Sequence, residues 1–260
     1  MSGGRAGRLL AVALNTFRET VRERVLYNLI VFAIVMILSG LLLSELSIRQ
    51  EERIIKDVAL AAMDFFGTLI AIFMGVGLVS KEIDRRSLYP LLAKPLSRGE
   101  FFLGKFAGLG FTLFVNVAVM WVGAMVALLL AGQGPGGLLM LKGVLAIYMG
   151  LLLVVALALL FSTLTSSAMA TVATVAVVLA GRYSDVVRNM RQVVPGAPGW
   201  LVSAAYYVIP NFHNFDFKGR VAYGDPVPAG DLAWVALYAV VYISFLLGLG
   251  LHAFKRRDLN

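Results

Sequence analysis

The stretch that decides the fold lies between two long apolar runs and reads VSKEIDRRSLYPLLAKPLSRGEFFLGK (residues 79–105). It holds six of the chain's 23 Lys and Arg residues. Leu88, Leu91 and Leu92 have the i, i+3, i+4 spacing that places side chains on one face of a helix. Pro95 ends this helix after about two turns, because helical conformation is disfavoured in the residue before a proline. The three leucines either dock on another protein or pack back on the chain's own surface, and both readings stay open.

A second helix signal follows directly. Ser97 and Glu100, three residues apart, have the spacing of a capping box, in which each side chain binds a backbone N–H at the start of a helix. We therefore expect a new helix to begin near Arg98 and to continue into the next apolar segment.

The composition indicates a polytopic membrane protein. Hydrophobic residues make up 60% of the 260 residues and charged residues 15%, whereas soluble domains have about 25% charged residues. The length fits one membrane domain, residues 1–260, without an additional soluble domain. Since there is no cysteine, disulfides and thiolate chemistry are excluded. The basic residues gather between apolar segments, which points to membrane orientation and not to nucleic-acid binding.

The predicted fold is an all-α integral membrane protein. Residues 7–24 form an amphipathic stripe of Leu10, Leu14, Phe17 and Val21, which favours an interfacial helix; the alternative is a soluble helix packed on a loop. Six apolar segments follow, each close in length to the roughly 20 residues that are needed to cross a bilayer. These six predicted spans are residues 25–44, 58–79, 106–131, 138–161, 162–181 and 232–254. We expect a tight hairpin at 162–167, and close helix packing by the Ala-, Ser-, Thr- and Val-rich fifth span.

The distribution of Lys and Arg predicts the orientation. Fourteen lie in the N-terminal segment, the loop and the C-terminal tail: Arg5, Arg8, Arg18, Arg22, Arg24, Lys81, Arg85, Arg86, Lys94, Arg98, Lys105, Lys255, Arg256 and Arg257. Nine lie on the other side: Arg49, Arg53, Lys56, Lys142, Arg182, Arg188, Arg191, Lys218 and Arg220. The excess of positive charge places both termini, the loop at 80–105 and the tail at 255–260 in the cytoplasm.

The long segment at 182–230 is predicted to form a lid on the outer side. Residues 200–209 are apolar but too few to span, which suits a short interfacial or re-entrant helix. Residues 216–230 are rich in Gly and Pro and are expected to form a loop. Asp231 is placed to cap the last helix, residues 231–254.

Catalytic and metal-binding motifs are absent from the sequence. There is no G-x-x-x-x-G-K-[ST] phosphate-binding loop, and the two histidines, His213 and His252, are 39 residues apart. We predict no enzyme activity, no bound cofactor and no metal site. Polar residues inside the spans are Asp64, Asn28 and Asn116. They either belong to a translocation path or hold helices together, with Asp64 near the outer interface.

Four motifs give the chain its resemblance to a known family. The first comprises Glu82, Arg85 or Arg86, Leu91-Leu92, Pro95, Arg98 and Gly104-Lys105. The others are FRETVRERVLY (residues 17–27), IPNF (209–212) and the ending FKRRDL (254–259). In these motifs and in the order of its segments, the chain resembles the permease subunit of type-2 ABC transporters. Within that family it looks most like the permease of the transporter that matures nitrous oxide reductase and other multicopper enzymes.

The resemblance implies a function that the residues alone do not supply. The loop would hold a short cytoplasmic coupling helix between the second and third spans, which docks on a separate ATPase subunit. Leu88, Leu91 and Leu92 would form the face that packs on the ATPase. Pro95 belongs to the same family pattern. The charged rim would be Glu82, Arg85, Arg86 and Arg98. ATP and Mg would be bound by the ATPase.

The family also implies partners and a location. Two permeases, here a homodimer, would assemble with two ATPases in the bacterial cytoplasmic membrane, with an outer-side (periplasmic) partner as a further expectation. The complex would export a substrate or perform conformational work across the membrane. A different class of function is a secondary transporter or channel that is driven by an ion gradient through Asp64. A third is a membrane anchor or assembly factor that moves nothing.

Overall fold

The computed structural model describes residues 5–20, 31–34, 51–84, 97–134, 137–184 and 208–256. These residues form helices and connections, with no β-strand among them. The elements are α1 (Arg5–Thr20), α3 (Glu51–Asp84), α5 (Arg98–Leu130), α6 (Gly137–Leu164), α7 (Ser167–Arg182), the 3-10 helix η2 (Phe212–Phe215), α11 (Lys218–Tyr223) and α12 (Ala229–Arg256).

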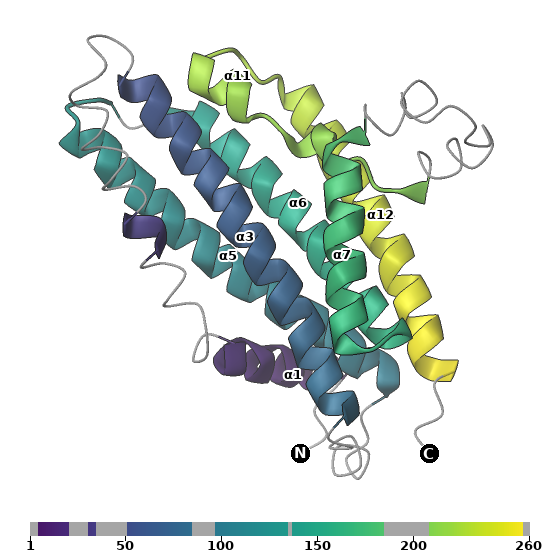
Figure 1. Ribbon diagram of the computed structural model, residues 1–260. Coiled ribbons are helices and arrows are strands. Elements are labelled where there is room, and N and C mark those ends of the chain that lie inside the picture. The colour runs from purple at the N-terminus through teal and green to yellow at the C-terminus, as the bar shows by residue number, and fades with distance from the viewer. Residues whose placement is uncertain are drawn as a thin grey trace, which may run out of the picture.

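The long helices α3, α5, α6 and α12 run side by side, and the shorter α7 lies along the same bundle (Figure 1). Helix α1 crosses one end of the bundle, where α3 and α12 end and α5 begins (Figure 1). We call this the terminal end, because the first described helix, α1, lies there and the last, α12, ends there. The distal end is the opposite one, where α3 and α12 begin and α5 and α7 end.

Helix α6 lies at the centre of the bundle. It packs against α3, α5, α7 and α12, and every residue from 153 to 160 is buried. Its sequence is apolar on all sides, which is typical of a helix that is surrounded by other helices. The outer helices instead expose large apolar side chains such as Phe111 on α5 and Phe245 on α12.

Glycines allow α3 to approach α6 closely. A Cβ atom built on Gly67 would lie 2.5 Å from Leu151, and one on Gly75 would lie 2.6 Å from the Cβ of Ala158. Ala71, between the two glycines, is buried as well. Small residues every four positions are the usual means by which helices pack tightly in membranes, where van der Waals contact replaces the hydrophobic effect.

Glycines also allow α1 to pack closely on α5. A Cβ on Gly104 would lie 2.7 Å from Val12, and one on Gly108 would lie 2.6 Å from the carbonyl oxygen of Ala13. The side chain of Lys105 is buried between these glycines. Helix α1 therefore packs directly on the first turns of α5.

Residues 208–228, which we call the cap, cover the distal ends of α3, α6 and α7 (Figure 1). Both ends of the cap are anchored by hydrogen bonds. Tyr242 donates to the carbonyl oxygen of Val208 at 2.8 Å, and Lys142 donates to that of Val227 at 2.6 Å. Between these anchors lie η2 and α11.

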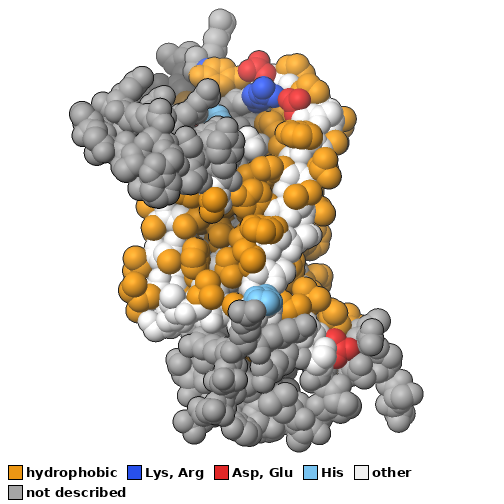
Figure 2. Space-filling model, turned by 90° about the vertical axis from the view of Figure 1, so that its right-hand side faces the viewer, with side chains coloured by type: hydrophobic (Ala, Val, Ile, Leu, Met, Phe, Trp, Pro, Cys, Tyr) orange, Lys and Arg blue, Asp and Glu red, His pale blue; other side chains and the backbone are white. Residues whose placement is uncertain are grey.

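Four helices are long and apolar enough to cross a membrane by length and composition: Glu52–Gly77, Gly99–Leu130, Gly137–Leu164 and Ala229–Phe254. They correspond to the second, third, fourth and sixth predicted spans. On the face shown in Figure 2, hydrophobic side chains cover the middle and the visible charged side chains lie toward the two ends. The all-helical fold is therefore confirmed, and its apolar helices are consistent with an integral membrane protein.

The number of six spans stays a prediction. Helix α7, the fifth predicted span, has only 16 residues, fewer than the roughly 20 that cross a bilayer. The first predicted span lies outside the described residues, apart from the helical residues 31–34. The short helix predicted at 200–209 also lies outside them, except for its last two residues.

Two local predictions are confirmed. The capping box forms as expected: the Glu100 N–H donates to Ser97 Oγ at 3.1 Å, and the Ser97 N–H donates to the Glu100 carboxylate at 2.9 Å. Helix α5 accordingly begins at Arg98. The hairpin between α6 and α7 is tight, since only residues 165 and 166 separate the two helices.

Helix α3 extends beyond the predicted span 58–79: it begins at Glu51, its first turns are polar, and an i, i+4 ion pair joins Lys56 to Glu52. Two details of the sequence prediction are wrong. Residues 216–230 are not all loop: they contain α11, whose buried Val221 holds it on the bundle. Asp231 lies inside the first turn of α12 and binds Arg220, so it is not the cap residue.

Candidate functional site

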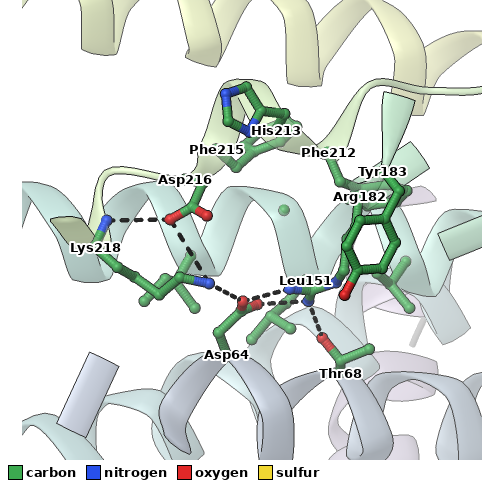
Figure 3. A pocket seen from close by; sticks show the side chains of 13 residues that line it. Asp64, Thr68, Leu151, Arg182, Tyr183, Phe212, His213, Phe215, Asp216 and Lys218 are labelled. Carbon is green, nitrogen blue, oxygen red and sulfur yellow. Dashed lines mark hydrogen bonds and ion pairs between the residues drawn. The ribbon is translucent and has the colours of Figure 1, made fainter. Parts of the chain in front are cut away.

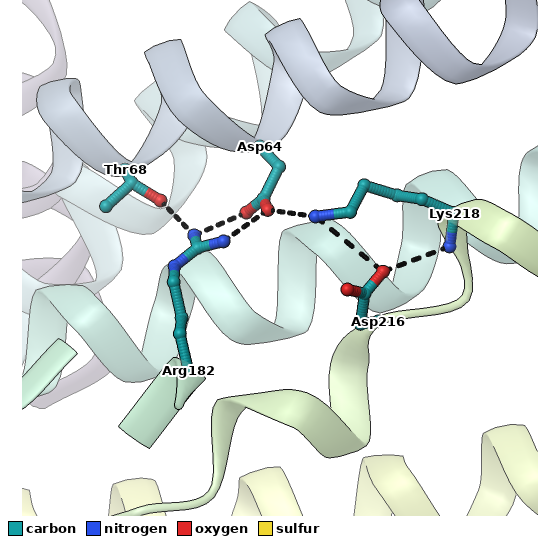
Figure 4. Close-up of polar contacts among 5 residues, drawn as sticks. All are labelled: Asp64, Thr68, Arg182, Asp216 and Lys218. Atoms are coloured by element: carbon teal, nitrogen blue, oxygen red, sulfur yellow. Dashed lines mark hydrogen bonds and ion pairs between the residues drawn. The ribbon is translucent and has the colours of Figure 1, made fainter. Parts of the chain in front are cut away.

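A cluster of charged side chains near the distal end joins three segments that are far apart in the sequence (Figure 4). Its centre is Asp64 on α3. Arg182, the last residue of α7, binds both carboxylate oxygens of Asp64, at 2.5 and 2.7 Å. Lys218, the first residue of α11, donates to the same carboxylate at 2.7 Å. One carboxylate thus connects α3, α7 and the cap.

Helix geometry positions the α3 part of this cluster. Thr68 lies one turn after Asp64 and on the same face, and its hydroxyl accepts a hydrogen bond from Arg182 at 2.8 Å. The guanidinium therefore has three hydrogen bonds to one face of α3. Such a bidentate pair fixes the orientation of both side chains.

Asp216 extends the cluster from within the cap. Its carboxylate lies 3.6 Å from the Lys218 Nζ and accepts the Lys218 backbone N–H at 3.3 Å. The two cationic and two anionic side chains balance in charge. The side chains are sheltered unequally: Asp64 is 15% exposed, Lys218 20% and Asp216 41%.

A cavity of about 220 Å³ lies beside the cluster. Figure 3 shows Asp64, Arg182 and Lys218 on one side of it and the aromatic residues of the cap on the other. Ile147, Leu151 and Val154 of α6 supply apolar walls, and Tyr183 and His213 contribute polar groups. A space of this size has room for several water molecules.

A second polar contact lies at the terminal end. The Lys105 Nζ is 3.9 Å from a carboxylate oxygen of Glu19 on α1 and 5.5 Å from the ring centre of Phe101. Only 2% of Lys105 is exposed. Gly104 and Lys105 end the family-like sequence pattern, and in the structure both residues hold α1 against α5.

All eight predicted coupling residues lie outside the described residues or have side chains that are not described. Arg85, Arg86, Leu88, Leu91, Leu92 and Pro95 belong to the first group. Glu82 lies in the last turn of α3 and Arg98 in the first turn of α5, both without a described side chain. Their role in coupling stays a prediction.

Two of the three polar residues predicted inside the spans belong to the part of the chain that the structure describes. Asp64 belongs to the distal cluster, and Asn116 is buried in the middle of α5 with 1% exposure. Asn28 lies outside the described residues. A role of these residues in a translocation path or in helix packing stays a prediction.

Sequence reasoning did not find the partners of Asp64. Arg182 and Lys218 were counted only as charges of the long loop. A signal for Arg182 exists, because an arginine that directly follows an apolar helix can reach back to an acid in a neighbouring span. Lys218 carries no comparable local signal. Among the described residues, no group of three or more His, Cys, Asp and Glu side chains is placed to hold a metal ion.

Comparison with known proteins identifies the family. The model of the ABC-2 family transporter proteins matches residues 10–259, nearly the whole chain. The chain belongs to this ABC-2 transporter family. No curated protein matches it. As an ABC-2 family chain with several apolar helices, it is a multi-pass membrane permease component of an ABC transporter. The narrower resemblance to the permease of nitrous oxide reductase maturation stays a prediction.

Proposed function

We propose that this chain couples ATP hydrolysis by a separate ATPase subunit to substrate export or conformational work across the bacterial cytoplasmic membrane. The observation that carries the proposal is the ABC-2 family match over residues 10–259. In the proposed complex, two copies of the chain bind two ATPases, which hold ATP and Mg. Both termini and the 80–105 loop face the cytoplasm.

The arrangement of the helices supports this assignment. Helix α3 ends and α5 begins at the terminal end, where α1 and the end of α12 lie (Figure 1). A coupling helix between Asp84 and Arg98 would therefore be connected directly to two long helices of the bundle. Because α1 packs on the first turns of α5, a displacement of α5 at this end would also act on α1.

The ion pairs of Asp64 favour this proposal over an ion-driven transporter. A carboxylate that binds a transported ion needs free coordination positions, whereas Asp64 already accepts hydrogen bonds from Arg182 and Lys218. Gradient-driven uptake by the purified chain without an ATPase would support the other mechanism.

The test is a substitution in the predicted coupling helix. Leu91→Asp places a charge in the apolar face that would dock on the ATPase, where truncation of a central residue costs about 2 kcal/mol or more. We expect the variant to insert in the membrane but to lose co-purification with the ATPase.

Leu164→Asp is the matched control. Leu164 is 54% exposed at the terminal end of α6, so the same charge change there should leave co-purification intact. Normal ATPase capture by Leu91→Asp would remove the coupling assignment.

A further inference from the structure

We propose that the cavity beside Asp64 is a binding site for a small uncharged molecule that carries several hydroxyl groups and has about the size of one sugar ring. The hydrogen-bonding groups of the site belong to Arg182 and Asp216, and its apolar wall belongs to α6 (Figure 3). The cap and the helices keep the positions that the structure shows.

Arg182 brings hydrogen-bond donors to the cavity. A guanidinium has five N–H donors, and three of those of Arg182 bind Asp64 and Thr68 on α3. The other N–H groups have no partner among the described residues, and the side chain is 29% exposed. Lys218 is less available, because it contacts both Asp64 and Asp216. A ligand in this cavity must therefore present oxygen acceptors to Arg182.

Asp216 brings an acceptor to the same cavity. Both of its contacts with Lys218 use Oδ1, so Oδ2 has no partner in the part of the chain that the structure describes. An ionised carboxylate accepts hydrogen bonds but does not donate them, which means that the ligand also needs donors. A hydroxyl group donates and accepts with one oxygen atom. A molecule with several hydroxyl groups therefore matches Arg182 and Asp216 together.

The charges of the site favour an uncharged ligand. Arg182 and Lys218 are balanced by Asp64 and Asp216. A charged ligand would lose its hydration on entry and would find no net opposite charge to compensate for that loss. An uncharged ligand only exchanges its hydrogen bonds with water for hydrogen bonds with the site.

The size and the apolar lining of the cavity indicate a ring. Its volume is about 220 Å³, less than the roughly 300–1,000 Å³ of pockets for drug-sized ligands. Leu151 and Val154 of α6 and the rings of Phe212 and Phe215 line it. Small-molecule sites usually combine such walls with a few polar groups that fix the orientation of the ligand. A sugar ring matches both, since it has C–H groups as well as hydroxyl groups.

The cavity is accessible without movement of the cap. Three residues of its lining are exposed: Tyr183 to 64%, Asp216 to 41%, and His213. A water-soluble molecule can therefore enter beside them. Transport of such a molecule as the cargo would rest on the proposed function, whereas binding itself does not.

The experiment measures how well a ligand protects a cysteine beside the cavity. The chain has no cysteine, so His213→Cys provides a single exposed thiol. The full-length chain in lipid nanodiscs is treated with a water-soluble maleimide in the presence of methyl α-D-glucopyranoside, methyl α-D-galactopyranoside or myo-inositol. At a concentration about ten times its Kd, a probe that binds should slow labelling about tenfold.

A cysteine away from the cavity is the control for non-specific effects of the probes. Gly134→Cys lies in the exposed turn between α5 and α6 at the same end of the bundle, and its labelling should not change. Glucosamine and glucuronate each add one charge to a similar ring. We expect both to protect His213→Cys at least about fivefold less well than the best uncharged probe.

Three second substitutions locate the binding. Arg182→Lys keeps a cation beside Asp64 but removes the planar set of donors, so the Kd of the probe should rise about tenfold. Asp216→Ala removes the free acceptor and should raise the Kd about fivefold or more. Asp231→Ala removes a carboxylate from the exposed pair with Arg220 at the same end and should leave the Kd unchanged.

Protection by none of the three uncharged probes would reject the site, and so would equal protection of Gly134→Cys. Equal protection by the charged rings, or an unchanged Kd in Asp216→Ala, would also reject it. If Arg182→Lys does not fold, the comparison of the two exposed carboxylates, Asp216 and Asp231, still decides. The assay needs no ATPase, so its failure leaves the permease assignment intact, and loss of that assignment leaves this result intact.

Discussion

At the scale of single residues, Asn116 is a buried side chain whose two polar atoms should lower the stability of the fold. It lies in the middle of α5 with 1% exposure, and neither its oxygen nor its nitrogen has a hydrogen-bond partner among the described residues. Thr112, one turn earlier, satisfies its hydroxyl by donating to the Gly108 carbonyl oxygen at 2.9 Å. A buried amide without a partner costs about 1–3 kcal/mol.

Replacement of this amide should therefore stabilise the chain. Asn116→Leu keeps the branched shape and removes both polar atoms, and we expect an increase of about 1–3 kcal/mol in the free energy of unfolding. Thermal unfolding in detergent measures it. Thr112→Val, which removes a satisfied hydroxyl, is the control and should change stability by no more than about 1 kcal/mol in either direction. A less stable Asn116→Leu would mean that the amide has a partner.

At the scale of the elements, the contact between α3 and α6 depends on the absence of side chains. Gly67 and Gly75 lie two turns apart on the face of α3 that contacts α6. Because α6 is central, this contact connects α3, which carries Asp64 and leads to the predicted coupling loop, to the rest of the bundle. Asp64 and Gly75 thus lie on the same helix, α3.

A side chain at Gly75 should separate the two helices. The Cβ of Gly75→Val would meet the Cβ of Ala158 at 2.6 Å, and overpacking of this kind costs about 1–3 kcal/mol. Gly77→Val is the matched control, since nothing lies within 4 Å of a Cβ there; we expect a change of at most about 0.5 kcal/mol. Chemical denaturation in detergent compares them. Equal stability of the two variants would contradict the close approach of α3 and α6.

At the scale of the whole molecule, the basic side chains at the distal end of the bundle are paired. Every basic side chain that the structure describes at the distal end has a partner. Arg182, Lys218, Lys56 and Arg220 are in ion pairs, Arg53 lies over an aromatic ring, and Lys142 binds a backbone carbonyl. These basic residues have structural roles at that end, independent of the excess of Lys and Arg that predicts the orientation.

The predicted orientation can be tested with single cysteines in this cysteine-free chain. Gly134→Cys lies in the exposed turn between α5 and α6 at the distal end, and Ser166→Cys lies in the exposed turn between α6 and α7 at the terminal end. A membrane-impermeant maleimide should label Gly134→Cys in intact cells and Ser166→Cys only after permeabilisation. The reverse pattern would place the predicted coupling loop outside the cytoplasm and would remove the proposed function with it.

Features that depend on neighbouring residues could be predicted from the sequence. Four spans, the tight turn after α6 and the capping box of Ser97 and Glu100 follow from hydropathy and local hydrogen bonding, which act over a few residues. The sequence of α6 has no polar face, which is typical of the central helix of a bundle. Helix α3 extends beyond its predicted span because polar residues continue the helix past its apolar part.

By itself, the sequence determined that this chain is helical, apolar enough for a membrane and punctuated by charged segments, because each of these properties is local. Only the tertiary structure decided that Asp64 meets Arg182 and Lys218, which are 118 and 154 residues away. It also decided that the cap rests on glycines of α6 and α7. Such contacts depend on how helices pack in three dimensions, and no local pattern encodes which of several charged residues a buried carboxylate will meet.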